Sequence, residues 1–142
     1  MNSDKTEGII VTSVDKQRLL KLIEQLYQRN QHTSAEAGAV MRRLRAGQEL
    51  PPEKVPRDVV TMNSTLCLQS LDGGGQCELT LVYPEDHNPD ESCWSVFGPV
   101  GAALYALRVG DEVELLLPKA EGRRWRLDNV TFQPEARGLM TL

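Results

Sequence analysis

Cysteine, aromatic residues and long apolar runs are all scarce in this sequence of 142 residues. Its three cysteines are irregularly spaced and form no CxxC pair, which excludes a disulfide scaffold and the common zinc motifs. Aromatic residues make up 5% of the chain, so the core must be mainly aliphatic. No apolar run approaches the roughly 20 residues that span a bilayer, and the polar N-terminus has no signal-peptide pattern. We therefore expect a cytoplasmic protein without a membrane partner, whose free cysteines serve as small buried apolar side chains: Cys67, Cys77 and Cys93.

Charge is unevenly distributed along the chain. The first 58 residues carry ten Lys or Arg and eight Asp or Glu, a net of +2, whereas residues 59–142 carry six and twelve, a net of −6. The sum of −4 argues against nucleic-acid binding as the main function. The asymmetry is compatible both with two surfaces for different partners and with ordinary solvated faces.

The N-terminal third of the chain begins with a short β-prone run and continues with a helical pattern. The β-prone run covers residues 8–12 and has the composition of a strand that pairs elsewhere. A capping box at Thr12–Asp15 follows, and the apolar spacing after it predicts a helix over residues 15–29. The apolar stripe of that helix consists of Leu19, Leu22, Ile23, Leu26 and Tyr27.

A second helix follows almost immediately. Another capping box at residues 33–36 begins it, and Gly47 stands where a helix C′ residue is favoured. Because so few residues join the two helices, we expect them to pack antiparallel as a hairpin arm within residues 1–50. The predicted tip of this arm consists of Asn30, Gln31, His32, Thr33 and Ser34.

A proline-containing linker is predicted over residues 51–63. Pro51, Pro52 and Pro56 prevent the helix from continuing and stiffen the connection. The heptapeptide Asp58–Ser64 begins within this linker and ends one residue after it. We expect it to be the hinge between the helical arm and the rest of the chain.

From residue 64 onwards the apolar period changes to two, which is typical of half-buried strands. Asp72–Gly75 predicts a hairpin turn, Pro99 predicts the start of one short helix, and a phase slip near Asp128 indicates a β-bulge. The expected fold class is α+β: a short N-terminal antiparallel helical hairpin, plus an antiparallel sheet curled over one short helix in residues 64–142. The expected strands cover residues 65–71, 77–83, 93–97, 113–117 and 125–132.

Motifs for catalysis, metal binding and DNA reading are absent. The glycines at 73–75 are not followed by the residues of a phosphate loop. The loop 85–91 holds four carboxylates and His87, but its spacing matches no EF-hand or zinc pattern, so a solvated loop is expected. A helix-turn-helix reader would need a third helix and a basic recognition face. We expect no cofactor and no metal.

Four stretches of the chain are distinctive: Val55–Ser64, Gly98–Leu104, Arg108–Glu112 and Gln133–Ala136. With these stretches the chain resembles the Gre family of transcript-cleavage factors and, within it, the Rnk group, the regulators of nucleoside diphosphate kinase. The resemblance covers nearly the whole chain. It implies that the C-terminal domain has an FKBP-like fold and docks on RNA polymerase near the entrance of its secondary channel, with the arm pointing towards that channel.

The chain departs from the Gre pattern at the end of its arm. In Gre factors a long coiled coil carries two acidic tip residues to the polymerase active site, where they help hold a second Mg²⁺ for RNA hydrolysis. Here the arm is much shorter and the tip at residues 30–34 has no carboxylate; Glu36 is the nearest and is expected to cap with Thr33. The resemblance therefore implies a non-enzymatic polymerase-binding regulator that competes with Gre factors and comes near nucleic acid only indirectly.

Docking on the polymerase is expected to involve Phe97, Gly98, Pro99 and Val100, because Gre proteins contact the polymerase with the segment before their Pro-led helix. Gre proteins often carry Asp-Ser where this chain has Phe97-Gly98. The alternative is that Pro99 only begins a helix and Phe97 only fills the core. At the tip, His32 is either a pH-responsive contact or an exposed loop residue without a role.

The arginines of the second helix have two possible roles at the level of sequence. Arg42, Arg43 and Arg45 either face RNA or an acidic polymerase surface, or offset the dipole of that helix.

Two alternative functions follow from the resemblance. An FKBP-like fold is shared with peptidyl-prolyl isomerases, but an isomerase site needs an aromatic-lined pocket, and the seven aromatic residues fall mostly at core positions. The Rnk resemblance also implies control of nucleoside diphosphate kinase level, directly or through transcription. The sequence determines neither the oligomeric state nor the angle between arm and body.

Overall fold

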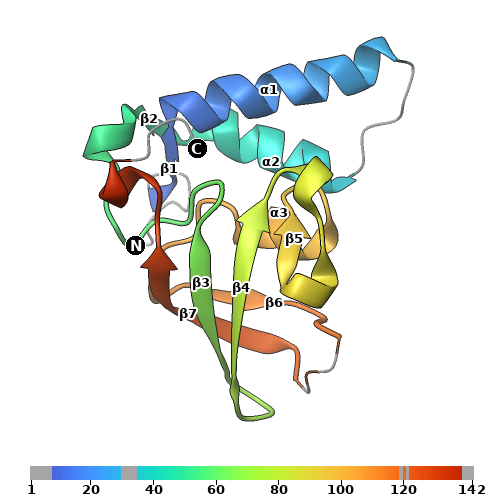
Figure 1. Ribbon diagram of the computed structural model, residues 1–142, viewed down its shortest axis with the longest axis vertical. Coiled ribbons are helices and arrows are strands. Elements are labelled where there is room, and N and C mark those ends of the chain that lie inside the picture. The colour runs from blue at the N-terminus through green and yellow to red at the C-terminus, as the bar shows by residue number, and fades with distance from the viewer. Residues whose placement is uncertain (1–7, 30–34, 119, 121, 139–142) are drawn as a thin grey trace.

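A pair of helices lies across one end of a curled five-stranded sheet (Figure 1). The α+β class predicted from the sequence is confirmed. The computed structural model describes residues 8–29, 35–118, 120 and 122–138. In chain order its main elements are β1 (Ile10–Thr12), α1 (Ser13–Gln28), α2 (Ala35–Ala46), β2 (Gln48–Leu50), β3 (Thr65–Ser70), β4 (Gln76–Val82), β5 (Cys93–Ser95), α3 (Pro99–Leu104), β6 (Glu112–Glu114) and β7 (Arg124–Phe132). None of the helices in these ranges is long and apolar enough to cross a membrane.

The two N-terminal helices are joined at their base by a short parallel sheet. β1 leads directly into α1 and β2 follows α2, and the two strands pair from Ile10 with Gln48 to Thr12 with Leu50. The β-prone run at residues 8–12 therefore finds a partner. The sequence did not predict β2, because Gln48 and its neighbour are polar and exposed and lack a strand-like pattern.

The first capping box lies at the start of α1. The Asp15 N–H donates to Thr12 Oγ1 at 2.8 Å, as the pattern predicts. The Asp15 carboxylate also accepts the N–H of Met62 at 3.1 Å. The start of α1 is thus tied to the segment that precedes β3.

Gly47 directly follows α2, at the helix C′ position that the sequence indicates. Its φ is not positive, and its N–H still donates to the Arg43 carbonyl at 2.8 Å. A Cβ at this position would lie 2.7 Å from Ile9 Cγ2 and 2.9 Å from the Arg43 carbonyl oxygen. Glycine is needed at this position because any side chain would collide with the segment that enters β1.

The five-stranded sheet has the order β5-β4-β3-β7-β6. The expectation of a fully antiparallel sheet is wrong at one edge, because β4 and β5 are parallel, with Thr80 opposite Cys93 and Val82 opposite Ser95. Two single-turn 3₁₀ helices, η3 (Pro84–Asp86) and η4 (Pro89–Glu91), return the chain to Thr80 in the second half of β4, where β5 begins. Proline begins each of these turns and prevents a direct hairpin.

The β-bulge predicted in the last strand is confirmed. Cys67 on β3 pairs with Asn129 and the next residue, Leu68, pairs with Leu127, so Asp128 is the extra residue on β7. A second register shift lies between the first two residues of β3. Extra residues bend a strand and increase its twist, which is why β7 curls around the helix side of the sheet.

Helices and sheet share one hydrophobic core. Leu19 of α1 and Val40 and Leu44 of α2 are fully buried in the same cluster as the inner face of the sheet. Trp125 and Tyr105 are the largest fully buried side chains in the described ranges, so two aromatic rings supplement the aliphatic core. The three cysteines are free, as expected, but they are half-exposed rather than buried.

The second half of the segment predicted as a linker is buried. Val59 and Val60 are fully buried and Met62 is 2% exposed. Val60 exchanges backbone hydrogen bonds with the chain after α3: its N–H donates to Leu107 at 2.8 Å, and its carbonyl accepts from Ala106 at 3.0 Å. These residues therefore form part of the folded body. The division into residues 1–50, 51–63 and 64–142 stays a prediction.

Arg43 connects α2 to α3. Its Nη1 donates to the carbonyls of Ala102 and, at 3.4 Å, Tyr105. The Ala102 carbonyl has lost its helical partner, because the Ala106 N–H donates to Val60. Burial lowers the pKa of the Arg43 guanidinium. Arg43 therefore supplies hydrogen bonds to the C-terminal end of α3, and it also lies in the last turn of α2, where a cation offsets the helix dipole.

Arg43→Met is expected to destabilise the protein by about 2 kcal/mol, because it keeps the aliphatic stem but leaves the Ala102 and Tyr105 carbonyls without a donor. Urea unfolding monitored by circular dichroism measures the change. Arg42→Met is the matched control, since Arg42 is exposed on the same helix and should cost less than about 0.5 kcal/mol. Equal effects of the two substitutions would contradict the bridging role.

Candidate functional site

The candidate docking segment forms a tight turn between β5 and α3. Ser95 organises this turn: its Oγ accepts the Phe97 N–H at 3.1 Å, and its carbonyl accepts the Gly98 N–H at 3.0 Å. The Ser95 N–H in turn donates to Nδ1 of His87 at 2.9 Å. The exposed loop between β4 and β5, expected to be merely solvated, thus anchors the start of the docking segment.

The four predicted docking residues differ in exposure. Pro99 is exposed at the first position of α3, and Phe97 and Gly98 are half-buried. Val100 is only 4% exposed and belongs to the core, so its side chain is not available to a partner. Phe97 also packs against the core, as the alternative interpretation of this residue expected. The docking role of the accessible part, residues 97–99, stays a prediction.

The remaining predicted candidates are the tip of the arm and the arginines of the second helix. The predicted tip, residues 30–34 with His32, falls outside the described residues. Arg42 and Arg45 are exposed on α2, whereas Arg43 contacts α3. The structure does not bring these arginines together into one cluster with the docking segment.

The stretches that carry the family resemblance meet in space. Gln133 Nε2 donates to the carbonyls of Pro56 at 2.7 Å and Val59 at 2.8 Å. Thr61 Oγ1 donates to the Glu135 carboxylate at 2.7 Å. The C-terminal tail therefore holds the heptapeptide in place, and the other face of the heptapeptide pairs with the chain after α3.

Two buried carboxyl groups lie at this junction. Burial, together with the negative charge of Glu135, raises the pKa of Asp15 from 3.8 to about 7, although hydrogen bonds from the Met62 N–H and the Tyr105 hydroxyl oppose the shift. Burial also raises the pKa of Glu135. The junction between α1, the heptapeptide and the tail therefore favours uncharged carboxyl groups.

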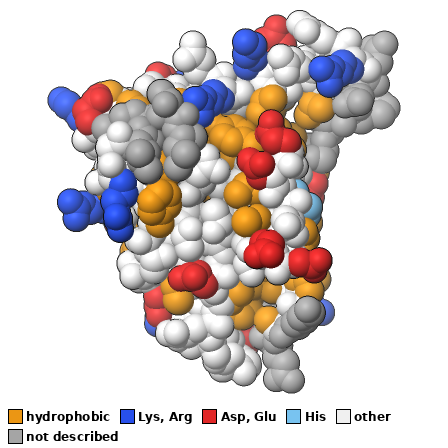
Figure 2. Space-filling model, viewed as in Figure 1, with side chains coloured by type: hydrophobic (Ala, Val, Ile, Leu, Met, Phe, Trp, Pro, Cys, Tyr) orange, Lys and Arg blue, Asp and Glu red, His pale blue; other side chains and the backbone are white. Residues whose placement is uncertain are grey.

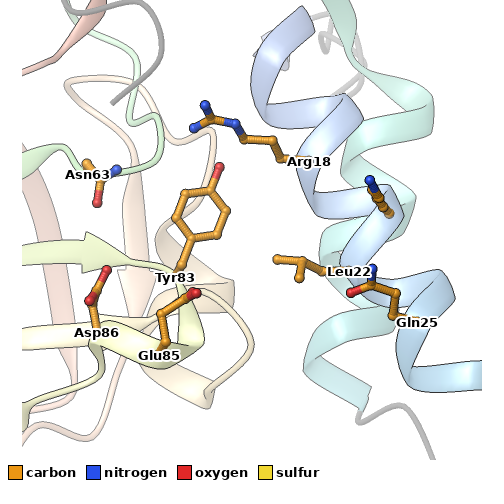
Figure 3. Close-up of a pocket in the computed structure, with 8 residues that line it drawn as sticks. Arg18, Leu22, Gln25, Asn63, Tyr83, Glu85 and Asp86 are labelled. Carbon is orange, nitrogen blue, oxygen red and sulfur yellow. The ribbon is translucent and has the colours of Figure 1, made fainter. Parts of the chain in front are cut away.

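An open cleft of about 670 Å³ separates α1 from the end of β4 and η3 (Figure 3). On the face shown in Figure 2, Asp and Glu side chains gather below α1, while Lys and Arg side chains lie along the upper and left edges. Hydrophobic side chains are visible between them. The cleft is lined by Arg18, Lys21, Leu22, Gln25, Asn63, Tyr83, Glu85 and Asp86.

The cleft walls combine charged, amide and apolar side chains. Across the described ranges, no three His, Cys, Asp or Glu side chains are placed to hold a metal ion. Sequence reasoning missed the cleft because its walls come from distant segments; the only local signal was the i, i+3, i+4, i+7 spacing of residues 18, 21, 22 and 25 on α1. It also missed the anchor formed by His87, since a loop histidine carries no pattern of its own.

Comparison with known proteins relates the chain to transcription factors. The family described as "Transcription elongation factor, GreA/GreB, C-term" matches residues 55–131. A solved structure of a prokaryotic transcription elongation factor GreA/GreB from Nitrosomonas europaea superposes with a TM-score of 0.74 at 33% identity. The alignment covers 87% of this chain and 98% of the Nitrosomonas chain.

Curated relatives place the chain more narrowly. The "Regulator of nucleoside diphosphate kinase" of Escherichia coli K12 is 37% identical over 135 residues, which cover 92% of this chain and 93% of that protein. The transcription elongation factor GreA of Chlorobium phaeobacteroides is 34% identical over 90 residues, 63% of this chain and 57% of that protein. The chain therefore belongs to the GreA/GreB family of transcription factors, in the group that includes the regulator of nucleoside diphosphate kinase.

Proposed function

We propose that this protein is a non-enzymatic regulator that binds RNA polymerase near the entrance of the secondary channel and competes there with Gre factors. Family membership over residues 55–131 is the observation that carries this proposal. The body would have the FKBP-like arrangement, with α3 packed against the curled sheet, and would make the main contact. The protein would act in the cytoplasm, where the polymerase works.

We do not expect transcript cleavage, because the helical pair is short and its predicted tip has no carboxylate. With 16 residues at about 1.5 Å each, α1 spans roughly 24 Å. Part of this length is used in packing, since Leu19 is fully buried in the common core. The predicted tip also has no carboxylate that would hold a second Mg²⁺ at the polymerase active site. A regulator of this shape would occupy the channel entrance without supplying the chemistry of cleavage.

The accessible docking surface would be centred on Pro99, with the exposed part of the Phe97 side chain beside it. Pro99 is exposed on a helix whose other residues are mostly buried, and the Ser95 hydrogen bonds hold the preceding turn rigid. A preorganised turn loses little conformational entropy when it binds. These features support its use as a contact with a large partner.

We expect the purified protein to bind core RNA polymerase at micromolar concentration and to inhibit Gre-stimulated RNA cleavage, without stimulating cleavage itself. Pro99→Glu should weaken binding about tenfold, since it places a charge in the centre of the contact. Glutamate suits the first turn of a helix, so folding is preserved. Affinity is measured by pull-down and biolayer interferometry, and cleavage is followed on stalled elongation complexes.

Pro89→Glu is the matched control, because Pro89 is also exposed and also begins a short helical turn. It should leave binding unchanged. No binding of the unmodified protein would remove the proposed function. Equal weakening by both substitutions would show that the contact with the polymerase is not centred on α3.

A further inference from the structure

The cleft beside α1 has two chemically different walls. Arg18, Lys21, Leu22 and Gln25 follow one another on a single face of α1. The opposite wall comes from three other places in the fold: the segment before β3, the end of β4 and η3. None of the lining residues belongs to the docking segment at residues 97–100.

Opposite charges face each other across this cleft. The α1 wall carries the guanidinium of Arg18 and the ammonium of Lys21. On the opposite wall, η3 carries the carboxylates of Glu85 and Asp86, which Figure 3 shows together with Arg18. Among the residues that the structure describes, Lys21, Glu85 and Asp86 make no ion pair. Backbone hydrogen bonds fix the acidic wall, with the Asp86 N–H donating to the Tyr83 carbonyl at 2.9 Å. The Lys21 ammonium and the two carboxylates are thus available to a bound molecule.

The middle of the cleft is apolar, with polar side chains at its edge. Leu22 and the ring of Tyr83 lie between the charged walls (Figure 3). Asn63 enters from the side with a left-handed backbone, φ 64°, and its N–H donates to the Leu81 carbonyl at 2.7 Å. Asparagine tolerates this conformation better than most other side chains do. Strain of this kind often accompanies binding sites.

We propose that this cleft binds a nucleoside phosphate, with the phosphates on Arg18 and Lys21 and the base against Tyr83 and Leu22. The carboxylates of η3 then accept hydrogen bonds from the donor edge of the base. Guanine is favoured over adenine, because its adjacent N–H and NH₂ donors match the two oxygens of one carboxylate. A volume of about 670 Å³ suits a ligand of this size.

An extended peptide fits the cleft less well. Peptides commonly bind by adding a strand to a free sheet edge, but β4 is paired on one side with β3 and on the other with β5. The two walls instead present side chains of opposite charge with an apolar floor between them. Such a site selects a compact molecule with an anionic end, a flat apolar body and a donor edge.

Isothermal titration calorimetry of the full chain with GDP tests the site. We expect GDP to bind at least about tenfold more tightly than guanosine or inorganic pyrophosphate alone, because each lacks one half of the contacts. Lys21→Glu and Asp86→Asn should each weaken GDP binding, and both residues are exposed, so the fold is preserved. Asn63→Gly removes a side chain from the cleft while keeping the backbone conformation, and it should also weaken binding.

Lys54→Glu is the control, since Lys54 is exposed and lies outside the cleft. Equal weakening by Lys21→Glu and Lys54→Glu would reveal only general charge attraction and would overturn the proposal. Pyrophosphate binding as tightly as GDP would do the same, and so would an absence of GDP binding at millimolar concentration. If the cleft substitutions instead weakened polymerase binding and GDP did not bind, the cleft would belong to a protein partner. Polymerase docking by the unmodified protein is measured separately, so the two proposals fail independently.

Discussion

Gly101→Ala is expected to destabilise the protein by about 3 kcal/mol or more and to disrupt the docking turn. A Cβ at Gly101 would overlap the carbonyl oxygen of Ser95 and would lie 2.6 Å from its carbonyl carbon and 2.9 Å from Val96 Cα. All three are backbone atoms, which cannot rotate away as a flexible side chain can. The substitution therefore forces α3 and the end of β5 apart. Chemical denaturation measures the loss of stability.

Gly98→Ala provides the matched control within the same turn. Gly98 has an ordinary φ of −93°, and its Cβ would lie 3.5 Å from the Ser95 carbonyl oxygen, a normal van der Waals distance. We expect a cost below about 1 kcal/mol, mainly because alanine is a poorer helix cap than glycine. A Gly101→Ala protein as stable as Gly98→Ala would contradict the close packing of this turn.

The stability of the protein is expected to fall as pH rises, through the buried carboxyl of Asp15. Burial raises the pKa of this group to about 7 in the folded state, so the folded protein retains a proton that the unfolded chain releases near pH 4. Because the unfolded state binds fewer protons in this interval, the free energy of unfolding decreases with increasing pH. The stabilising effect of the neutral carboxyl is complete below about pH 4 and is lost as pH passes about 7. Between pH 5 and pH 8 this single group should cost on the order of 2 to 3 kcal/mol.

Asp15→Asn isolates this contribution. Its amide oxygen can still accept the Met62 N–H and the Tyr105 hydroxyl, but it cannot ionise. The difference in unfolding free energy between the variant and the unmodified protein should therefore grow from pH 5 to pH 8. Glu135→Gln should flatten the curve in the same direction, because burial also raises the pKa of Glu135. Parallel pH curves for Asp15→Asn and the unmodified protein would show that Asp15 does not hold the proton.

The buried junction and the docking turn are connected through α3. Tyr105 follows α3 directly, and its hydroxyl donates to Asp15 at 3.3 Å, while Arg43 donates to carbonyls at the end of the same short helix. Therefore α2 contacts α3 itself, and α1 contacts the residue that follows it. In the proposed complex, the orientation of the helical pair would depend on these contacts as well as on the prolines before the heptapeptide.

Local patterns predicted the elements well. The apolar spacing placed the first helix at residues 15–29 and α1 is Ser13–Gln28, while the phase slip placed a bulge near Asp128, where the register shifts. Side-chain periodicity and proline positions act within a few residues, so they are readable along the chain. The resemblance that indicated the family rested on equally local stretches, and the comparisons confirm it.

Contacts between distant segments were not predictable in this way. The parallel pairing of β1 with β2 and of β4 with β5 joins strands whose sequences differ little from those of antiparallel strands. Asp15 belongs to a capping box by sequence, yet its carboxylate bonds to Met62 and Tyr105, 47 and 90 residues away. The cleft likewise depends on the distance between α1 and η3, which neither segment specifies.

By itself, the order of amino acids determined the class of fold, the family, the positions of helices and turns, and the absence of acid from residues 30–34. Only the tertiary structure decided that the heptapeptide is buried, that Val100 is inaccessible, that Arg43 caps α3 and that oppositely charged walls enclose a cleft. The physical reason is one of range. Backbone propensity and apolar period act between near neighbours, whereas burial, pKa shifts and charge complementarity arise only when remote segments share the same space.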